Sequence, residues 1–313
     1  MTGPRADGRA RRGWQRDHAP EPGGGRLTTF SIHVGAHKTA TTYLQSRLQQ
    51  GSAHLRTQNI LFEPMPKFRA RFTRHLWRAF RKVPEAPTPQ DLQAAFGFYL
   101  RQAEGHFVAS DENLVGTCNL SGRVYADSKA RFEFLKACLP GSPDVVVLTV
   151  REYAGWLASY YSESIRWQPF VSFDTYKRRL KLDDGLWVRV VEALVETFGA
   201  GTVKVMRYET LQDRLPALLS TLCGAPIDET KLPESDDRRE GLSAAAIEAV
   251  GKIADLSDAH IASSAIDAAM KRFPRSPEFP AFAPWSAEEI HRLKALYADH
   301  MSDIGRRHPG IFI

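Results

Sequence analysis

Residues 27–50 read LTTFSIHVGAHKTATTYLQSRLQQ, and this stretch decides the fold. Its first part, Leu27 to Val34, is short, apolar and rich in β-branched residues, which is typical of a buried strand. From Thr41 onward, leucines at positions 44 and 48 recur with the spacing of a helix. The polar segment Gly35 to Thr42 therefore joins a strand to a helix.

The same alternation of strands and helices continues along the chain. Further buried strands are predicted at 106–110, 144–150 and 202–208, and helices at 91–102, 127–138, 152–164, 186–198, 211–222, 242–256 and 286–303. Residues 61–89, which include five prolines, are expected to be irregular apart from some helix. This order predicts an α/β fold with three α/β/α layers and a mostly parallel central sheet, whose ligands bind beyond the carboxyl ends of the strands.

The composition of the 313 residues is that of an ordinary globular protein, with 43% hydrophobic and 25% charged residues. No run of 18 apolar residues exists, so no membrane span is expected. The N-terminus holds no apolar segment typical of a secretory signal. Cys118, Cys138 and Cys223 lie far apart and match neither a zinc site nor a disulfide framework. We therefore expect a cytoplasmic protein without a bound metal.

The formal net charge of +6 is divided between a tail and the rest of the chain. Residues 1–26 carry six arginines against three carboxylates and are rich in glycine and proline, so we expect a disordered basic tail. Residues 27–313 are expected to form a single domain. Its mild positive charge suits a site for an anionic ligand better than a DNA-binding face, and no nucleic-acid partner is expected. The sequence does not specify an oligomeric state.

The segment between the first strand and the first helix has the chemistry of an anion cradle. Backbone N–H groups there and at the helix N-terminus can hold a phosphate. Lys38 adds a positive charge, and Thr39, Thr41 and Thr42 add hydroxyl donors. The order Gly35-Ala-His-Lys is not that of a Walker A loop, which needs Gly-Lys-Ser/Thr after four intervening residues. The alternative interpretation is a polar helix cap with a surface lysine.

This loop closely resembles the 5′-phosphosulfate-binding loop of sulfotransferases that use 3′-phosphoadenosine 5′-phosphosulfate (PAPS). The family pattern is Lys-Ser/Thr-Gly-Thr-Thr/Ser followed by an aromatic or apolar residue, and residues 38–43 read KTATTY. The resemblance implies that the loop from His37 to Tyr43 binds the donor. Ala40 departs from the pattern because it occupies the glycine position. Its methyl group would crowd the phosphate if the backbone there has a positive φ.

A second signature follows the strand at 144–150. The family places an arginine at the end of this strand and a serine eight residues later, and together they bind the 3′-phosphate of the donor. Arg151 and Ser159 stand at that spacing. An arginine can hold a phosphate through two parallel hydrogen bonds. In the alternative interpretation, Arg151 pairs with Glu152 or another carboxylate and Ser159 faces the sheet.

Two weaker matches support the resemblance, which covers residues 28–222, and a third lies beyond this range. Tyr208 in VMRYETL lies where the family has a tyrosine near adenine, and Tyr43 lies where many members have a tryptophan that packs on adenine. Arg239 lies where the family often has a basic loop over the 3′-phosphate. For the two tyrosines, packing in the core is the alternative. The resemblance implies a sulfotransferase domain with a P-loop-like fold.

The resemblance also implies a reaction. The sulfuryl group of PAPS would pass by in-line displacement to a hydroxyl or amine, leaving 3′,5′-adenosine bisphosphate (PAP), and Lys38 would stabilise the leaving phosphate oxygen. Family members use a His or Glu just past the second strand as the base. The strand HFVAS, which ends at Ser110, runs into Asp111-Glu112-Asn113-Leu114, and this junction resembles the Ser-x-Glu segment of the carbohydrate and protein-tyrosine branches. Glu112 is therefore the predicted base, with Asp111 and His37 as alternatives.

The acceptor and two rival functions stay open at this point. A small molecule or a carbohydrate is the expected partner. The basic, aromatic stretch 67–82 is either a solvated helix face over a buried aromatic stripe or a wall of the acceptor site. The rival functions are a P-loop-like small-molecule kinase, which would need ATP and Mg²⁺, and a non-catalytic protein that binds nucleotides or nucleic acid.

Overall fold

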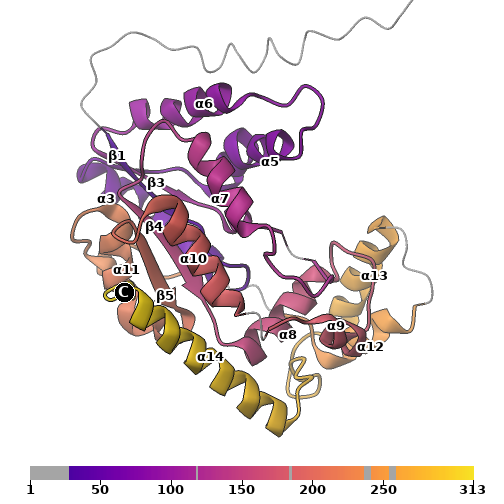
Figure 1. Ribbon diagram of the computed structural model, residues 1–313. Coiled ribbons are helices and arrows are strands. Elements are labelled where there is room, and N and C mark those ends of the chain that lie inside the picture. Colours follow the sequence, from indigo (N-terminus) through magenta and orange to yellow (C-terminus); the bar gives the residue numbers. More distant parts are fainter. Residues whose placement is uncertain (1–27, 118, 183–184, 236–240, 254–258) are drawn as a thin grey trace, which may run out of the picture.

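A five-stranded parallel sheet forms the centre of the protein, as the computed structural model in Figure 1 shows. The structure describes residues 28–117, 119–182, 185–235, 241–253 and 259–313. The strands are β1 (Thr29–His33), β2 (Ile60–Phe62), β3 (His106–Ser110), β4 (Val145–Val150) and β5 (Val203–Arg207). Their order is β2-β3-β1-β4-β5, and each neighbouring pair is parallel. The predicted parallel sheet is confirmed.

Helices cover both faces of the sheet and give the predicted three layers. Alternate residues of the strands enter different apolar clusters, so that Val146 and Leu148 of β4 face one layer and Val147 faces the other. The cluster around Val147 includes α2 (Thr41–Gln50), α3 (Ser52–Thr57) and α11 (Leu211–Cys223). The opposite cluster includes α6 (Pro89–Gln102), α7 (Ser128–Ala137), α8 (Tyr153–Ser164), α10 (Leu186–Phe198) and α14 (Ala287–Arg307).

A smaller group of helices lies beside α8 and away from the sheet in Figure 1. It consists of α9 (Phe173–Arg179), α12 (Ala244–Gly251) and α13 (Ala259–Arg272). The sequence did not predict α9 or α13, and the helix predicted at 242–256 is shorter than expected. Three 3₁₀ turns complete the described elements, namely η2 (Glu112–Leu114), η3 (Tyr208–Thr210) and η4 (Glu229–Lys231).

The segment 60–80 is more regular than its prolines suggest. It contains the edge strand β2, then α4 (Met65–Phe68), a π-helical turn (Arg69–Thr73) and α5 (Arg74–Phe80). The helix expected within this segment is confirmed, and residues 81–88 are irregular as predicted, whereas the strand β2 was not predicted. Pro66 lies in the first turn of α4, where the missing N–H has no intrahelical partner to lose. In the part of the chain that the structure describes, no helix is both long enough and apolar enough to cross a membrane.

Candidate active site

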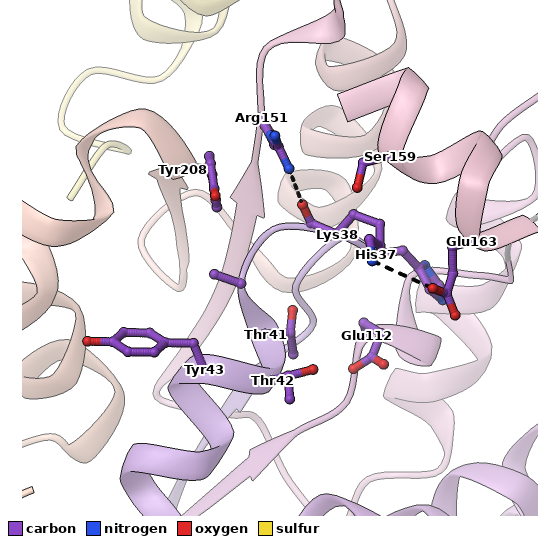
Figure 2. Close-up of a pocket in the computed structure, with 11 residues that line it drawn as sticks. His37, Lys38, Thr41, Thr42, Tyr43, Glu112, Arg151, Ser159, Glu163 and Tyr208 are labelled. Atoms are coloured by element: carbon purple, nitrogen blue, oxygen red, sulfur yellow. Dashed lines mark hydrogen bonds and ion pairs between the residues drawn. The ribbon is translucent and has the colours of Figure 1, made fainter. Parts of the chain in front are cut away.

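A pocket opens at the carboxyl ends of the strands, between the loop after β1 and the helix α8 (Figure 2). It is lined by His37, Lys38, Ala40, Thr41, Thr42, Tyr43, Glu112, Arg151, Ser159, Glu163 and Tyr208. All of these except Glu163 were singled out in the sequence. Segments more than a hundred residues apart therefore meet at one pocket, although their roles there stay predictions.

The loop after β1 has an unusual backbone. Lys38 has φ 64° and Ala40 has φ 62°, and Thr39 between them has no positive φ. Such alternation turns successive N–H groups toward one side and forms an anion-binding concavity. A left-handed conformation costs roughly 1–2 kcal/mol for a residue with a side chain. Strain of this kind persists where the surrounding structure and function require it.

Three residues of the loop illustrate how closely it is packed. A Cβ on Gly35 would lie 2.7 Å from the His33 ring and 2.8 Å from Thr41 Oγ1, so only glycine fits there. Thr41 Oγ1 is buried without a hydrogen-bond partner and belongs to a pocket-lining residue. Thr39 behaves differently, because it is buried, does not line the pocket and donates its hydroxyl to Ala36 O at 2.6 Å. This hydrogen bond joins two residues of the loop and stabilises its conformation.

A polar layer supports the loop from below. His33 lies 3.0 Å from Ser110 Oγ through Nδ1 and 3.0 Å from Thr149 Oγ1 through Nε2, so it links β1 to both neighbouring strands. Gln45 of α2 donates to Ser110 O and Oγ. Burial lowers the pKa of His33 to about 4, despite the opposing influence of Glu112. The ring is therefore neutral at ordinary pH.

Arg151 lies at the end of β4 and connects the two predicted donor signatures. Its Nη1 donates to Lys38 O at 3.0 Å, and its guanidinium carbon lies 4.3 Å from the centre of the Tyr208 ring. The alternative pairing with Glu152 is wrong. The Glu152 carboxylate instead accepts from the N–H groups of Ala154 and Gly155 and caps α8. Ser159 lines the pocket and is not fully buried against the sheet.

Glu163 is the pocket residue that the sequence analysis missed. Its Oε2 lies 3.6 Å from Lys38 Nζ, as Figure 2 shows, and 3.9 Å from Arg166 Nε. Its Oε1 accepts from Trp167 Nε1 at 3.1 Å. The signal that could have found it is its position four residues after Ser159, which puts both side chains on one face of α8.

Glu112 and Asp111 share one guanidinium but differ in exposure. Arg69 Nη2 lies 3.1 Å from Glu112 Oε1 and also bonds Asp111, which receives the Arg69 Nε hydrogen bond as well. Asp111 is fully buried and does not line the pocket, and burial raises its pKa although Arg69 opposes this. Glu112 lines the pocket, and its Oε2 is buried without a hydrogen-bond partner.

The electrostatics keep Glu112 ionised. Burial opposes the charge, but neighbouring His37 and Arg69 outweigh it, and the pKa of Glu112 lies below its ordinary value. Burial also lowers the pKa of His37, so that its ring is neutral at ordinary pH. Where His37 is neutral, the permanent positive charge of Arg69 is what keeps the pKa of Glu112 low. Of the two carboxylates, only Glu112 offers an oxygen to the pocket.

His37 already uses both of its ring nitrogens. Nδ1 lies 2.9 Å from the Tyr125 hydroxyl, which also accepts from the His37 backbone N–H at 3.1 Å, and Nε2 lies 3.1 Å from Asn113 Oδ1. These partners are satisfied together when Nε2 carries the proton and Tyr125 donates to Nδ1. In this network His37 has no free lone pair for a proton. The geometry therefore favours Glu112 over His37 as a base and gives His37 a positioning role.

Other residues from the sequence analysis lie elsewhere. Arg239 lies outside the described residues, as do Cys118 and the tail at 1–26. Within the described ranges, no group of three or more His, Cys, Asp or Glu side chains could hold a metal ion.

Comparison with known proteins adds little to this geometry. No family model and no curated protein matches the chain. Among solved structures, a sulfotransferase from Alicyclobacillus acidocaldarius is similar, with 15% identity and a TM-score of 0.39 over 69% of this chain and 87% of that chain. A likeness as distant as this carries no functional argument, so the function is argued from the residues of the pocket.

Proposed function

We propose that this protein is a sulfotransferase that moves a sulfuryl group from PAPS to a hydroxyl or amine acceptor. One observation carries the proposal. Residues of the loop from His37 to Tyr43, together with Arg151 and Ser159, line a single pocket at the carboxyl ends of the strands. These are the residues that the resemblance to the sulfotransferase family assigns to the two ends of the donor.

The chemistry of the pocket fits a donor with two anionic ends. Lys38, the loop N–H groups and the unpartnered hydroxyl of Thr41 form a set of donors for the 5′-phosphosulfate. Arg151 and Ser159 would hold the 3′-phosphate, which distinguishes PAPS from ATP. Tyr208, whose ring lies against the Arg151 guanidinium, and Tyr43 would flank the adenine.

Three side chains would act on the reaction itself. PAPS supplies the activated sulfuryl group. Lys38 would leave Glu163 and donate a hydrogen bond to the oxygen on which charge develops. Glu112, which is ionised, lines the pocket and has an unpartnered oxygen, would accept the proton of the acceptor at Oε2. His37 would position the loop through Tyr125 and Asn113.

Ligand-dependent thermal stability tests this proposal. PAP should raise the melting temperature because a ligand that binds only the folded state stabilises it by mass action. ATP with Mg²⁺ and adenosine 5′-diphosphate should have much smaller effects because they lack the 3′-phosphate. Transfer of labelled sulfate from PAPS to a panel of sugar, phenol and amine acceptors then tests turnover. Stabilisation by ATP but not by PAP would exclude the proposal.

A further inference from the structure

A row of six cations runs along the outer face of the segment 65–82. These exposed residues, called here the cationic stripe, are Lys67, Arg71, Arg74, Arg78, Arg81 and Lys82. The sequence contains no carboxylate between Glu63 and Glu85. The stripe alone therefore carries as much positive charge as the formal net charge of the whole chain, which is +6.

Helical spacing explains why the stripe is continuous. From Lys67 to Arg78 the cations recur every three or four residues, which puts them on one face of α4, the π-helical turn and α5. Arg81 and Lys82 extend the row just past the end of α5. The opposite face is buried through Phe68, Phe72 and Leu76. At the rise of an α-helix, the stripe is about 22 Å long.

The stripe cations differ from their neighbour Arg69. Arg69 turns inward and pairs with Asp111 and Glu112, whereas none of the six has a described carboxylate within ion-pair distance. Glu63 is the carboxylate that acts on two of them, Lys67 and Arg71, from farther away. Like charges in a row repel one another, so the stripe costs stability in the absence of a ligand. A solvated helix face of a folded domain more often mixes both signs of charge. This arrangement points to a partner that supplies the missing negative charge.

We propose that the cationic stripe is a docking surface for an acidic polysaccharide, that is, a linear sugar chain with carboxylate or sulfate groups. A linear polyanion matches a straight row of cations longer than any single small anion. The docking does not depend on the proposed function. The further step, that the docked polymer carries the sulfate acceptor, does rest on it.

The surroundings of the stripe argue against nucleic acid and against a membrane. Of the phenylalanine and tryptophan side chains of the segment, Phe68, Phe72 and Trp77 are buried, and the half-buried Phe80 packs on Trp77 and Phe134. They offer no open platform for stacking bases. Among the described residues, the only exposed large apolar side chain in this segment is Val83, too little to insert into lipid.

The same segment borders the candidate active site. Arg69 holds the carboxylate of Glu112, and Trp77 Nε1 donates to Asn113 O at 3.0 Å, so both halves of the segment are anchored to the wall of the pocket. A polymer on the outer face is separated from this wall by one helix diameter, about 10 Å. Docking there would raise the local concentration of acceptor groups near the pocket.

Fluorescence anisotropy with an end-labelled oligogalacturonate longer than the stripe tests the proposal without any donor. The full-length protein should bind this probe in a salt-dependent manner and should not bind a neutral oligoglucose of equal length. The triple variant Arg71→Gln/Arg74→Gln/Arg78→Gln should bind about tenfold more weakly, because each exposed ion pair contributes up to a few-fold. Its affinity should also depend less steeply on salt.

A matched variant separates the stripe from general charge. Arg275→Gln/Arg292→Gln/Lys294→Gln removes three exposed cations elsewhere and should bind the oligogalacturonate like the wild type. Equal weakening in both triple variants, or unchanged binding in the stripe variant, would overturn the proposal. Tighter binding of a single-stranded oligonucleotide or of phosphatidylserine vesicles than of the oligogalacturonate would overturn it as well. Stabilisation by PAP, measured on the same samples, reports separately on the proposed function.

Discussion

The two ends of the pocket are built in different ways. At the donor end, Lys38 and Arg151 come from loops that directly follow strands, and each belongs to a short motif in the sequence. At the acceptor end, Glu112 depends on Arg69, which lies 43 residues away in the chain, and Glu163 on α8 holds Lys38. Local sequence thus marks the residues proposed to bind phosphate, whereas the two carboxylates of the pocket depend on tertiary pairing.

Glu112→Gln is the sharpest test of the acceptor end. Turnover should fall by about 10²–10⁴-fold, the usual contribution of a general base, because the amide cannot accept the proton. Stabilisation by PAP should persist, since Arg151 and the loop are unchanged. The measurement combines steady-state sulfate transfer with thermal shift.

Glu163→Gln is the matched control for that variant. It removes a second carboxylate of the same pocket, so a simple effect of charge should appear in both variants. We expect the loss of turnover to be far smaller in Glu163→Gln than in Glu112→Gln. Near-normal turnover in Glu112→Gln would remove Glu112 from the mechanism.

His33 lies beneath the pocket, and its lowered pKa predicts that the folded protein loses stability in acid. Its pKa is about 4 in the folded protein against about 6.5 in the unfolded chain, so the unfolded state binds more protons between these values. The stability that the neutral His33 ring contributes is therefore fully present above pH 6.5 and is lost as the pH falls toward 4. The group accounts for about 3 kcal/mol over this window.

Chemical denaturation at a series of pH values checks this expectation. His33→Asn should be less stable at neutral pH and should lose less stability on acidification than the wild type. The exposed His291, changed to Asn, should leave the acid dependence as it was. A parallel pH dependence of the wild type and His33→Asn would contradict the assignment.

Much of the fold could be predicted from the sequence because its signals are local. Buried strands such as β4 and the glycine turn after β1 are visible within a few residues. The edge strand β2 could not be predicted, because three residues are too few to show a period and only the neighbouring β3 makes them a strand. The same limit applies to the pocket. No local pattern links Arg69 to Glu112, whereas Glu163 was within reach because it follows Ser159 by one helical turn.

Arg151→Ala tests the donor end of the pocket, where the 3′-phosphate is proposed to bind. Affinity for PAP should fall by about 10–100-fold, since a charge-assisted hydrogen bond contributes about 1.5–3 kcal/mol. The affinity of Arg151→Lys for PAP should lie between those of Arg151→Ala and the wild type, because lysine keeps the charge but loses the planar guanidinium group. Isothermal titration with PAP and with adenosine 5′-diphosphate separates the two phosphates. An equal loss for both nucleotides would mean that Arg151 does not recognise the 3′-phosphate.

Ala40→Gly should have the smallest effect and bears on the one departure from the family pattern. Ala40 has φ 62° and precedes α2 without capping it through a side chain. Glycine removes roughly 1–2 kcal/mol of left-handed strain but adds back about 0.5–1 kcal/mol of chain entropy. A net gain of up to about 1 kcal/mol in the free energy of unfolding is expected, whereas Thr42→Gly inside α2 should destabilise the protein.

If Ala40→Gly also tightens PAP binding, the methyl group crowds the donor. If the free energy of unfolding rises and the affinity for PAP does not, the methyl group of Ala40 does not hinder binding, and this alanine lowers only the stability of the fold. A loss of stability in Ala40→Gly would contradict the left-handed backbone on which both readings depend.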